Sequence, residues 1–123
     1  MATTSTILVA DDDSGIRTVV TQALVRSGYD VIPVGDGTSL MDKVRSGEGD
    51  LLVTDVILPD GNGLDMIPEI QALRPDMKII VMSAQTTLMT AVKATELGAY
   101  EYLPKPFDIN ELTRNIKAAL DTT

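Results

Sequence analysis

Acidic side chains directly follow two apolar runs of the chain, at positions where they could act together. Asp11, Asp12 and Asp13 come after the first run, and Asp55 comes after the third. An Asp after a strand is often a turn former or a helix cap, and we expect this of Asp13. If the fold brings the other three carboxylates together, each pair at ~5 Å and an effective dielectric constant of ~20 would repel by roughly 3 kcal/mol. A cation or a protonated group must then offset the repulsion, and an all-oxygen site favours Mg²⁺.

One cationic side chain, Lys105, stands between two prolines near the end of the chain. A lone lysine is usually a solvated surface charge. Here Pro104 and Pro106 stiffen the backbone and aim the side chain, and the Lys105–Pro106 bond is a candidate cis peptide. The formal charges of three carboxylates, one Mg²⁺ and one ammonium cancel. Such a neutral pocket could accept a dianionic phosphoryl group.

The composition argues against other kinds of chemistry. The chain has no histidine and no cysteine, which excludes imidazole bases, histidine-ligated zinc, disulfides and thiol nucleophiles within it. The lack of cysteine also fits a cytoplasmic protein. A net charge of −8 argues against nucleic acid as a direct partner, because neutralising phosphates requires clustered Lys and Arg. No run approaches the ~20 apolar residues that span a bilayer, so no membrane contact is expected.

Five apolar runs, most of them rich in β-branched residues, are typical of strands. Nearly continuous runs indicate strands that are covered on both faces, as in a parallel sheet. Pro33 in the second run and the more polar composition of the fifth run place these two at the sheet edges. The predicted strands are 7–10, 31–34, 51–54, 79–82 and 100–103.

Stretches with helical spacing separate the runs. Gly28 and Gly98 suit helix ends, and a sequence resembling a capping box at 108–111 precedes the last helix. Pro68 is tolerable only near the first turn of its helix. The predicted helices are 16–27, 38–44, 64–73, 88–95 and 109–120.

This alternation predicts one α/β domain, a (βα)₅ flavodoxin-like doubly wound parallel sheet with strand order 2-1-3-4-5. In such sheets, ligands bind at the carboxyl ends of the strands where the strand order reverses. That point lies between the first and third strands, which are followed by Asp11, Asp12 and Asp55. Ser83 and Lys105 follow the fourth and fifth strands, so we expect them at the same edge.

With these residues in place, the chain resembles a response-regulator receiver domain of two-component signalling over essentially its whole length. Each motif alone is modest, but their order and placement are specific. The motifs are Asp11-Asp12, the run at 55–61, Ser83-Ala84 and the run at 98–107. The runs at 81–85 and 102–108 further resemble the NtrC group of nitrogen regulators.

The resemblance implies a reaction and a metal site. Asp55 would be phosphorylated by a sensor histidine kinase. Asp12 and Asp55 would bind Mg²⁺ directly, Asp11 mostly through water, and Ile57 through its backbone carbonyl.

The resemblance also implies which residues respond to phosphorylation. Lys105 and Ser83 would contact the phosphoryl group, with Ser83 in place of the commoner Thr. Tyr102 would be the aromatic switch residue, although a packed or snorkelling surface aromatic is the alternative. Ile57 and Gln85 lie where they could gate the attacking water.

Beyond this domain, the NtrC resemblance implies that residues 1–123 are the N-terminal part of a longer transcriptional regulator. Its own downstream domains would be an AAA+ ATPase that acts on σ54 polymerase and a helix-turn-helix domain that binds DNA. A stand-alone receiver is the alternative. A receiver homodimer is an expectation for the activated form, and exposed residues near Met89 would form a partner-facing surface unless Met89 is core filler.

Other functions fit the sequence less well. The domain is expected to be regulatory rather than an enzyme, with only self-catalysed phosphotransfer and slow autodephosphorylation. A Mg²⁺-dependent aspartyl-phosphate phosphohydrolase often needs a second acid where this chain has Ile57. A nucleotide-binding module would need a glycine-rich loop where the three consecutive aspartates stand. A pure interaction domain would not require the complete set of site residues.

Overall fold

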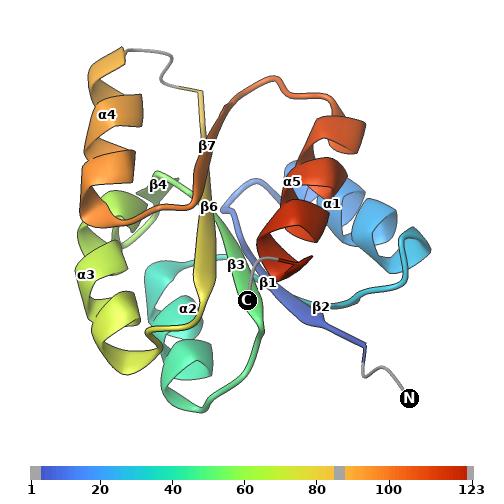
Figure 1. Ribbon diagram of the computed structural model, residues 1–123, viewed down its shortest axis with the longest axis horizontal. Helices are drawn as coiled ribbons and strands as arrows, with labels where there is room; N and C mark the ends of the chain where they lie inside the picture. The colour runs from blue at the N-terminus through green and yellow to red at the C-terminus, as the bar shows by residue number, and fades with distance from the viewer. Residues whose placement is uncertain (1–3, 85–87, 122–123) are drawn as a thin grey trace.

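The apolar runs form the strands of one parallel sheet, with helices on both of its faces (Figure 1). The structure, a computed structural model, describes residues 4–84 and 88–121. The sheet has five strands in the order β2-β1-β3-β6-β7, which along the chain is the predicted order 2-1-3-4-5. The strands are β1 (Thr6–Ala10), β2 (Asp30–Val34), β3 (Leu51–Asp55), β6 (Lys78–Ser83) and β7 (Glu101–Pro104). The predicted flavodoxin-like fold is therefore confirmed.

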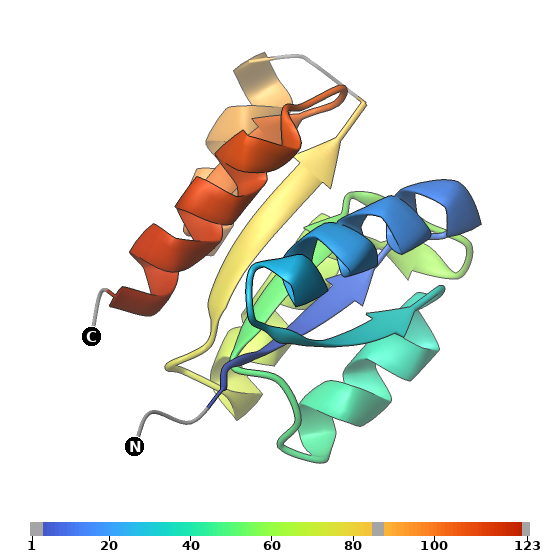
Figure 2. The ribbon, with the colours of Figure 1, turned by 90° about the vertical axis from the view of Figure 1, so that its right-hand side faces the viewer.

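The helices cover the sheet in two groups, as Figures 1 and 2 show. One face carries α1 (Ser14–Arg26) and α5 (Ile109–Asp121). The other carries α2 (Gly37–Arg45), α3 (Gly63–Leu73) and α4 (Leu88–Leu97). Within the described ranges, no helix has both the length and the apolar composition to cross a membrane.

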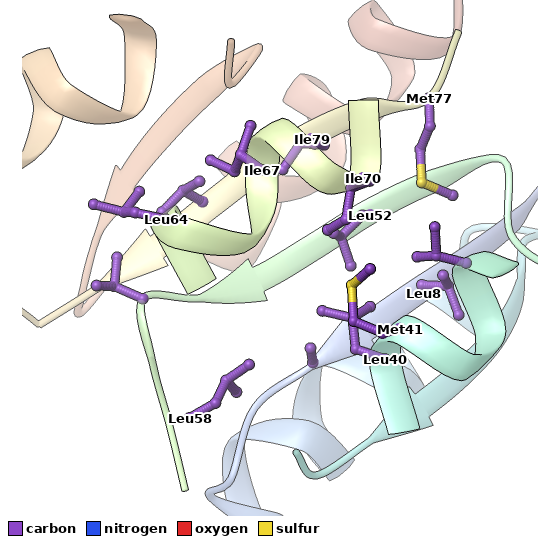
Figure 3. Close-up of a cluster of buried hydrophobic side chains, with 14 of the residues drawn as sticks. Leu8, Leu40, Met41, Leu52, Leu58, Leu64, Ile67, Ile70, Met77 and Ile79 are labelled. Carbon is purple, nitrogen blue, oxygen red and sulfur yellow. The ribbon is translucent and has the colours of Figure 1, made fainter. Parts of the chain in front are cut away.

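The nearly continuous apolar strands are explained by burial on both faces. Along β1, Leu8 and Ala10 belong to one core cluster, and Ile7 and Val9 belong to the other. All four are fully buried, because successive side chains of a strand point to opposite faces. Figure 3 shows the first cluster, where residues of the sheet meet those of α2 and α3. Complete burial of each large aliphatic side chain stabilises the fold by about 1.5–3 kcal/mol.

The predicted sheet edges and helix ends are confirmed. β2, which contains Pro33, and β7 are the two outer strands. Asp13 is the N-cap of α1, and its carboxylate accepts hydrogen bonds from the N–H groups of Gly15 at 2.8 Å and Ile16 at 3.1 Å. Gly28 and Gly98 follow α1 and α4 with φ of 96° and 110°, a conformation that costs glycine little.

The structure differs from the sequence-based expectation in two places. Pro68 is the sixth residue of α3, not part of its first turn. Its side chain is exposed, and its position in the helix interior leaves the Leu64 carbonyl without the N–H donor that another residue would provide. The second difference is a short hairpin directly after Asp55, made by β4 (Ile57–Leu58) and β5 (Gly61–Asn62).

Arg74 fixes the loop between α2 and β3, and its removal should destabilise the domain. Its guanidinium donates hydrogen bonds to the carbonyls of Glu48 at 3.1 Å and Gly49 at 2.6 Å. Hydrogen bonds that involve a charged group contribute about 1.5–3 kcal/mol, so Arg74→Met should lower the free energy of unfolding by about 2 kcal/mol. Urea unfolding measures this, with the exposed Arg114→Met as the control. Equal stability of the two variants would contradict the prediction.

Candidate functional site

The sheet brings the acidic residues together at one edge. β1 and β3 are parallel neighbours, with Ala10 opposite Thr54. Asp11 directly follows β1, and Asp55 is the last residue of β3. Asp11, Asp12 and Asp55 each offer one carboxylate oxygen, and these atoms all lie within 4.8 Å of one another. The strand order thus gathers the three carboxylates, as expected from the topology.

The three carboxylates differ in exposure and in local support. Asp11 is fully buried and Asp55 is 9% exposed, whereas Asp12 is exposed. Asp11 accepts a hydrogen bond from the Asp13 N–H at 2.9 Å, and its own carbonyl accepts one from Arg17 at 2.7 Å. The chain therefore holds two carboxylates inside the site and leaves a third at its mouth.

Lys105 connects the two buried carboxylates. Its ammonium donates to Asp11 Oδ2 at 2.8 Å and to Asp55 Oδ2 at 2.9 Å. Its backbone N–H donates to the Ser83 carbonyl at 2.7 Å, and its bond to Pro106 is cis. Burial lowers the pKa of Lys105, but the hydrogen bonds to Asp11 and Asp55 and the attraction of their charges raise it above its ordinary value overall. The side chain is therefore a fixed positive charge.

Ser83 lies on β6, the strand next to the one that carries Asp55, and Tyr102 lies on β7, one strand further out. Ser83 ends β6, is 1% exposed and stands opposite Pro104 of β7. Tyr102 lies in the middle of β7, half-buried against the core cluster that includes Leu64 and Ala94. In this conformation Tyr102 packs at the rim of the core. Gln85 lies outside the described residues.

The donor set fits a hard divalent cation. Three carboxylates face one ammonium, so the site has a formal charge of −2 without a metal. Carboxylate oxygens and a backbone carbonyl are the ligands that Mg²⁺ prefers. Ile57 lies two residues beyond Asp55, and its N–H is 3.4 Å from Asp55 Oδ1. The hairpin therefore brings the Ile57 backbone beside the acidic cluster.

Three contributions to the site were not foreseen from the sequence. Arg17 supports the Asp11 turn, and Asp60 ties the hairpin to α2. Gly63 lies against the backbone of Asp55, because an added Cβ there would collide with the Asp55 carbonyl oxygen. The closely spaced glycines after Asp55 were the available signal for Gly63. Arg17 and Asp60 resembled ordinary exposed charges.

The exposed apolar residues of α4 form a separate surface. Met89 and Leu88 are 76% and 79% exposed, so Met89 is not core filler. Val92 of the same helix is 42% exposed.

Comparison with known proteins identifies the family of the chain. The family model described as response regulator receiver domain matches residues 7–117. The chain is 59% identical over 118 residues to the DNA-binding transcriptional regulator NtrC of Azospirillum brasilense. It is 56% identical over 118 residues to the protein of that name in Rhizobium meliloti (strain 1021). Both matches cover 96% of this chain but only 24% of the relative.

Solved structures show the same fold. A receiver domain protein (CheY-like) from Methanospirillum hungatei JF-1 has a TM-score of 0.92 and 30% identity, over 97% of this chain and 95% of that one. The beryllofluoride-activated NtrC4 receiver domain dimer has a TM-score of 0.90 and 33% identity, over 94% of this chain and 96% of that one. The chain therefore belongs to the response regulator receiver domain family and is a receiver of the NtrC type.

Proposed function

We propose that this domain is the phosphoacceptor switch of a two-component system, in which Asp55 takes a phosphoryl group from a phosphohistidine of a sensor histidine kinase. The observation that supports this most strongly is the Asp55 carboxylate itself. Asp55 is the last residue of β3, and its carboxylate lies beside two further carboxylates and the ammonium of Lys105. A nucleophile, a cation site and a fixed positive charge are the components that phosphoryl transfer requires.

Asp12 and Asp55 would bind Mg²⁺ directly, Asp11 mostly through water, and Ile57 through its carbonyl. The N–H of Ile57 is directed at Asp55, and the N–H and C=O groups of one residue in an antiparallel ladder point to the same edge. The Ile57 carbonyl is therefore expected on the side of the acidic cluster. A bound Mg²⁺ supplies positive charge that offsets the charge of the phosphoryl oxygens.

In the proposed reaction, an oxygen of Asp55 attacks the phosphorus in line, and the bond from phosphorus to the donor's imidazole nitrogen breaks. The product is an acyl phosphate on Asp55. Lys105 already contacts Asp55 Oδ2 and would transfer this contact to a phosphoryl oxygen. The protein's contribution is positioning and electrostatics, so the domain acts as a regulatory phosphoacceptor that catalyses only its own phosphotransfer and slow autodephosphorylation.

The hydroxyl of Ser83 would donate a hydrogen bond to the phosphoryl group. A phosphoryl group adds hydrogen-bond acceptors, and Ser83 lies at the end of the strand beside β3. Drawing its hydroxyl toward Asp55 would open space for Tyr102, which packs against the core cluster that includes Ala94 of α4. The exposed apolar surface of α4 would then change its packing, as a shift between two pre-existing conformations.

The output is proposed from the relatives. The chain spans about a quarter of the length of the NtrC regulators that it matches. We propose that it is the N-terminal part of a cytoplasmic transcriptional regulator of nitrogen metabolism. A downstream ATPase domain would act on σ54 polymerase, and a helix-turn-helix domain would bind DNA. An activated receiver homodimer is supported by the dimeric NtrC4 receiver. A stand-alone receiver that acts through protein contacts is the alternative.

Phosphorylation of the isolated domain tests the central proposal. The domain is incubated with acetyl phosphate in Mg²⁺ or in EDTA and analysed by intact mass. The expected result is one phosphoryl group in Mg²⁺ and none in EDTA, located on the peptide that contains Asp55. Equal uptake in EDTA, or a phosphoryl group on another peptide, would disprove the proposal.

Ile57 is proposed to slow dephosphorylation, because its apolar side chain offers no hydrogen bond to an attacking water. The side chain is 54% exposed, so substitution should not disturb the core. Ile57→Asn should shorten the phosphoryl lifetime by about tenfold, the effect of one hydrogen bond of ~1.4 kcal/mol in the transition state. Decay of the phosphorylated mass measures this, with Ile57→Val as the apolar control. An unchanged or longer lifetime in Ile57→Asn would remove the idea.

A further inference from the structure

The hairpin that follows Asp55 is anchored firmly at its base. Val56 donates its N–H to the Met82 carbonyl of β6 at 3.0 Å, and Gly63 donates to the Val56 carbonyl at 2.6 Å. Asn62 is the N-cap of α3 and accepts a hydrogen bond from the Leu64 N–H at 2.8 Å. The two ends of the hairpin are thus tied to the sheet and to α3.

The tip of the hairpin is tied to a different element, helix α2, through the side chain of Asp60. Asp60 Oδ1 accepts a hydrogen bond from the Gly37 N–H at 2.7 Å. Asp60 Oδ2 accepts from the N–H of Thr38 at 2.9 Å and from its hydroxyl at 2.8 Å. These hydrogen bonds hold the pKa of Asp60 below its ordinary value, and the bond from the Gly37 N–H has the largest effect. Although Asp60 is exposed, its charged carboxylate therefore binds the first turn of α2, where a negative charge is favourable.

The contact around the Asp60 carboxylate is close. A Cβ added to Gly37 would collide with the end of Met66 and would lie 3.1 Å from Asp60 Oδ1. Leu58, at the end of β4 in the same hairpin, is 4% exposed and belongs to the core cluster (Figure 3). Burial of Leu58 resists lifting of the hairpin from the sheet. The directional hydrogen bonds of Asp60 fix its position along α2.

Ile57 lies in this hairpin, three residues before Asp60 and beside Asp55. Mg²⁺ requires nearly ideal octahedral geometry with short metal–oxygen distances, so a small displacement of a carbonyl ligand weakens binding. Residues that orient ligands from outside the metal's coordination shell affect metal affinity strongly. The Asp60 carboxylate, engaged by three donors, is itself committed to α2.

We propose that Asp60 is a positioning residue for the metal pocket: by fastening the tip of the hairpin to α2, it holds the Ile57 carbonyl where a Mg²⁺ ion bound by Asp12 and Asp55 requires it. This inference rests on the proposed function. Helix α2 thereby becomes a mechanical support of the phosphorylation site, although it carries none of the reacting groups.

Titration with Mg²⁺ alone, measured by calorimetry, tests the inference. Asp60→Ala should raise the Kd for Mg²⁺ by about tenfold, the lower end of the range for such supporting residues. Thr38→Val, which removes one hydrogen bond and no charge, should raise it by a smaller factor. Asp65→Asn is the matched control: it removes one negative charge from an exposed position in the first turn of α3 and should leave the Kd within about twofold.

A second measurement separates positioning from general loss of structure. Phosphorylation of Asp60→Ala by acetyl phosphate should require more Mg²⁺ for half-saturation but approach the wild-type rate at saturating Mg²⁺, because the reacting groups are unchanged. A lower unfolding temperature with an unchanged Kd would reduce Asp60 to a structural role and overturn the inference. Should Asp60→Ala not fold, an unchanged Kd in Thr38→Val would overturn it equally.

The two proposals can fail separately. If the wild-type domain binds no Mg²⁺ and takes up no phosphoryl group, the proposed function is wrong. If the wild type does both and Asp60→Ala binds Mg²⁺ as tightly as Asp65→Asn does, only the inference about Asp60 is wrong.

Discussion

The Asp55→Asn variant is expected to take up no phosphoryl group from acetyl phosphate and to lose most of the stabilisation that Mg²⁺ gives the wild type. An amide is a poor nucleophile and a weaker metal ligand than a carboxylate. Ligand binding to the folded state stabilises it by about 2.7 kcal/mol at one hundred times the Kd. A variant that binds Mg²⁺ weakly cannot gain this amount at the same concentration.

Without Mg²⁺, the stability of Asp55→Asn should differ little from that of the wild type, because two opposing effects are removed together. Attraction between Asp55 and Lys105 at 2.9 Å is worth roughly 6 kcal/mol at an effective dielectric constant of ~20. Repulsion from Asp11 and Asp12, each within 4.8 Å, is worth roughly 3 kcal/mol per pair on the same scale. The attraction and the summed repulsion therefore nearly cancel.

Intact mass and thermal unfolding with and without Mg²⁺ measure these effects for Asp55→Asn. The exposed acid Asp42 provides the control, since Asp42→Asn also removes one charge but lies in α2 outside the acidic cluster. The control should be phosphorylated and stabilised by Mg²⁺ as the wild type is. A phosphoryl group on Asp55→Asn in the presence of Mg²⁺ would mean that another residue is the acceptor.

The Lys105→Met variant should instead lose stability, by about 3–5 kcal/mol without Mg²⁺ at neutral pH. Methionine fills similar space but leaves Asp11, which is fully buried, and Asp55, which is 9% exposed, without a compensating charge. The same change makes the formal charge of the site more negative, from −2 to −3, so Mg²⁺ should bind more tightly and restore part of the stability. Phosphorylation should nevertheless slow, because no ammonium remains for the phosphoryl oxygens.

The pH dependence of this difference has a definite sign. The pKa of Lys105 in the folded protein lies above its ordinary value of 10.5. The stability that Lys105 contributes is therefore fully present below the ordinary value and is lost as the pH rises through the raised pKa. Chemical unfolding should show that the contribution of Lys105 to the difference in unfolding free energy between the wild type and Lys105→Met is constant up to pH ~10.5. This contribution should become smaller as the pH rises further. The exposed Lys117→Met is the control, and a Lys105→Met variant as stable as this control would contradict the expectation.

Much of the fold could be predicted because its determinants are local. The apolar runs, their β-branched composition and Pro33 identified the strands and one edge. Asp13 and Gly28 marked the beginning and end of α1. Each of these features depends on a residue's own backbone or on its near neighbours in the chain, so it can be predicted from the order of residues alone.

The clustering of acids could also be predicted, since it follows from topology. Once the strand order is known, the residues after β1 and β3 must meet at the same edge of the sheet. The sequence did not indicate how far each carboxylate would be buried, nor that Lys105 bridges Asp11 and Asp55. That bridge joins residues 94 and 50 positions apart, so it depends on the packing of complete elements.

The sequence by itself determined that this is a (βα)₅ receiver with acids at the ends of two strands. Only the tertiary structure decided that Asp60 clamps the hairpin to α2 and that Gly63 must be small beside Asp55. Pro68 was misjudged for a related reason: a helix keeps an interior proline when its packing outweighs the lost hydrogen bond, and that packing depends on the other elements. Periodicity identifies elements, whereas distances between side chains of different elements arise only when those elements pack together.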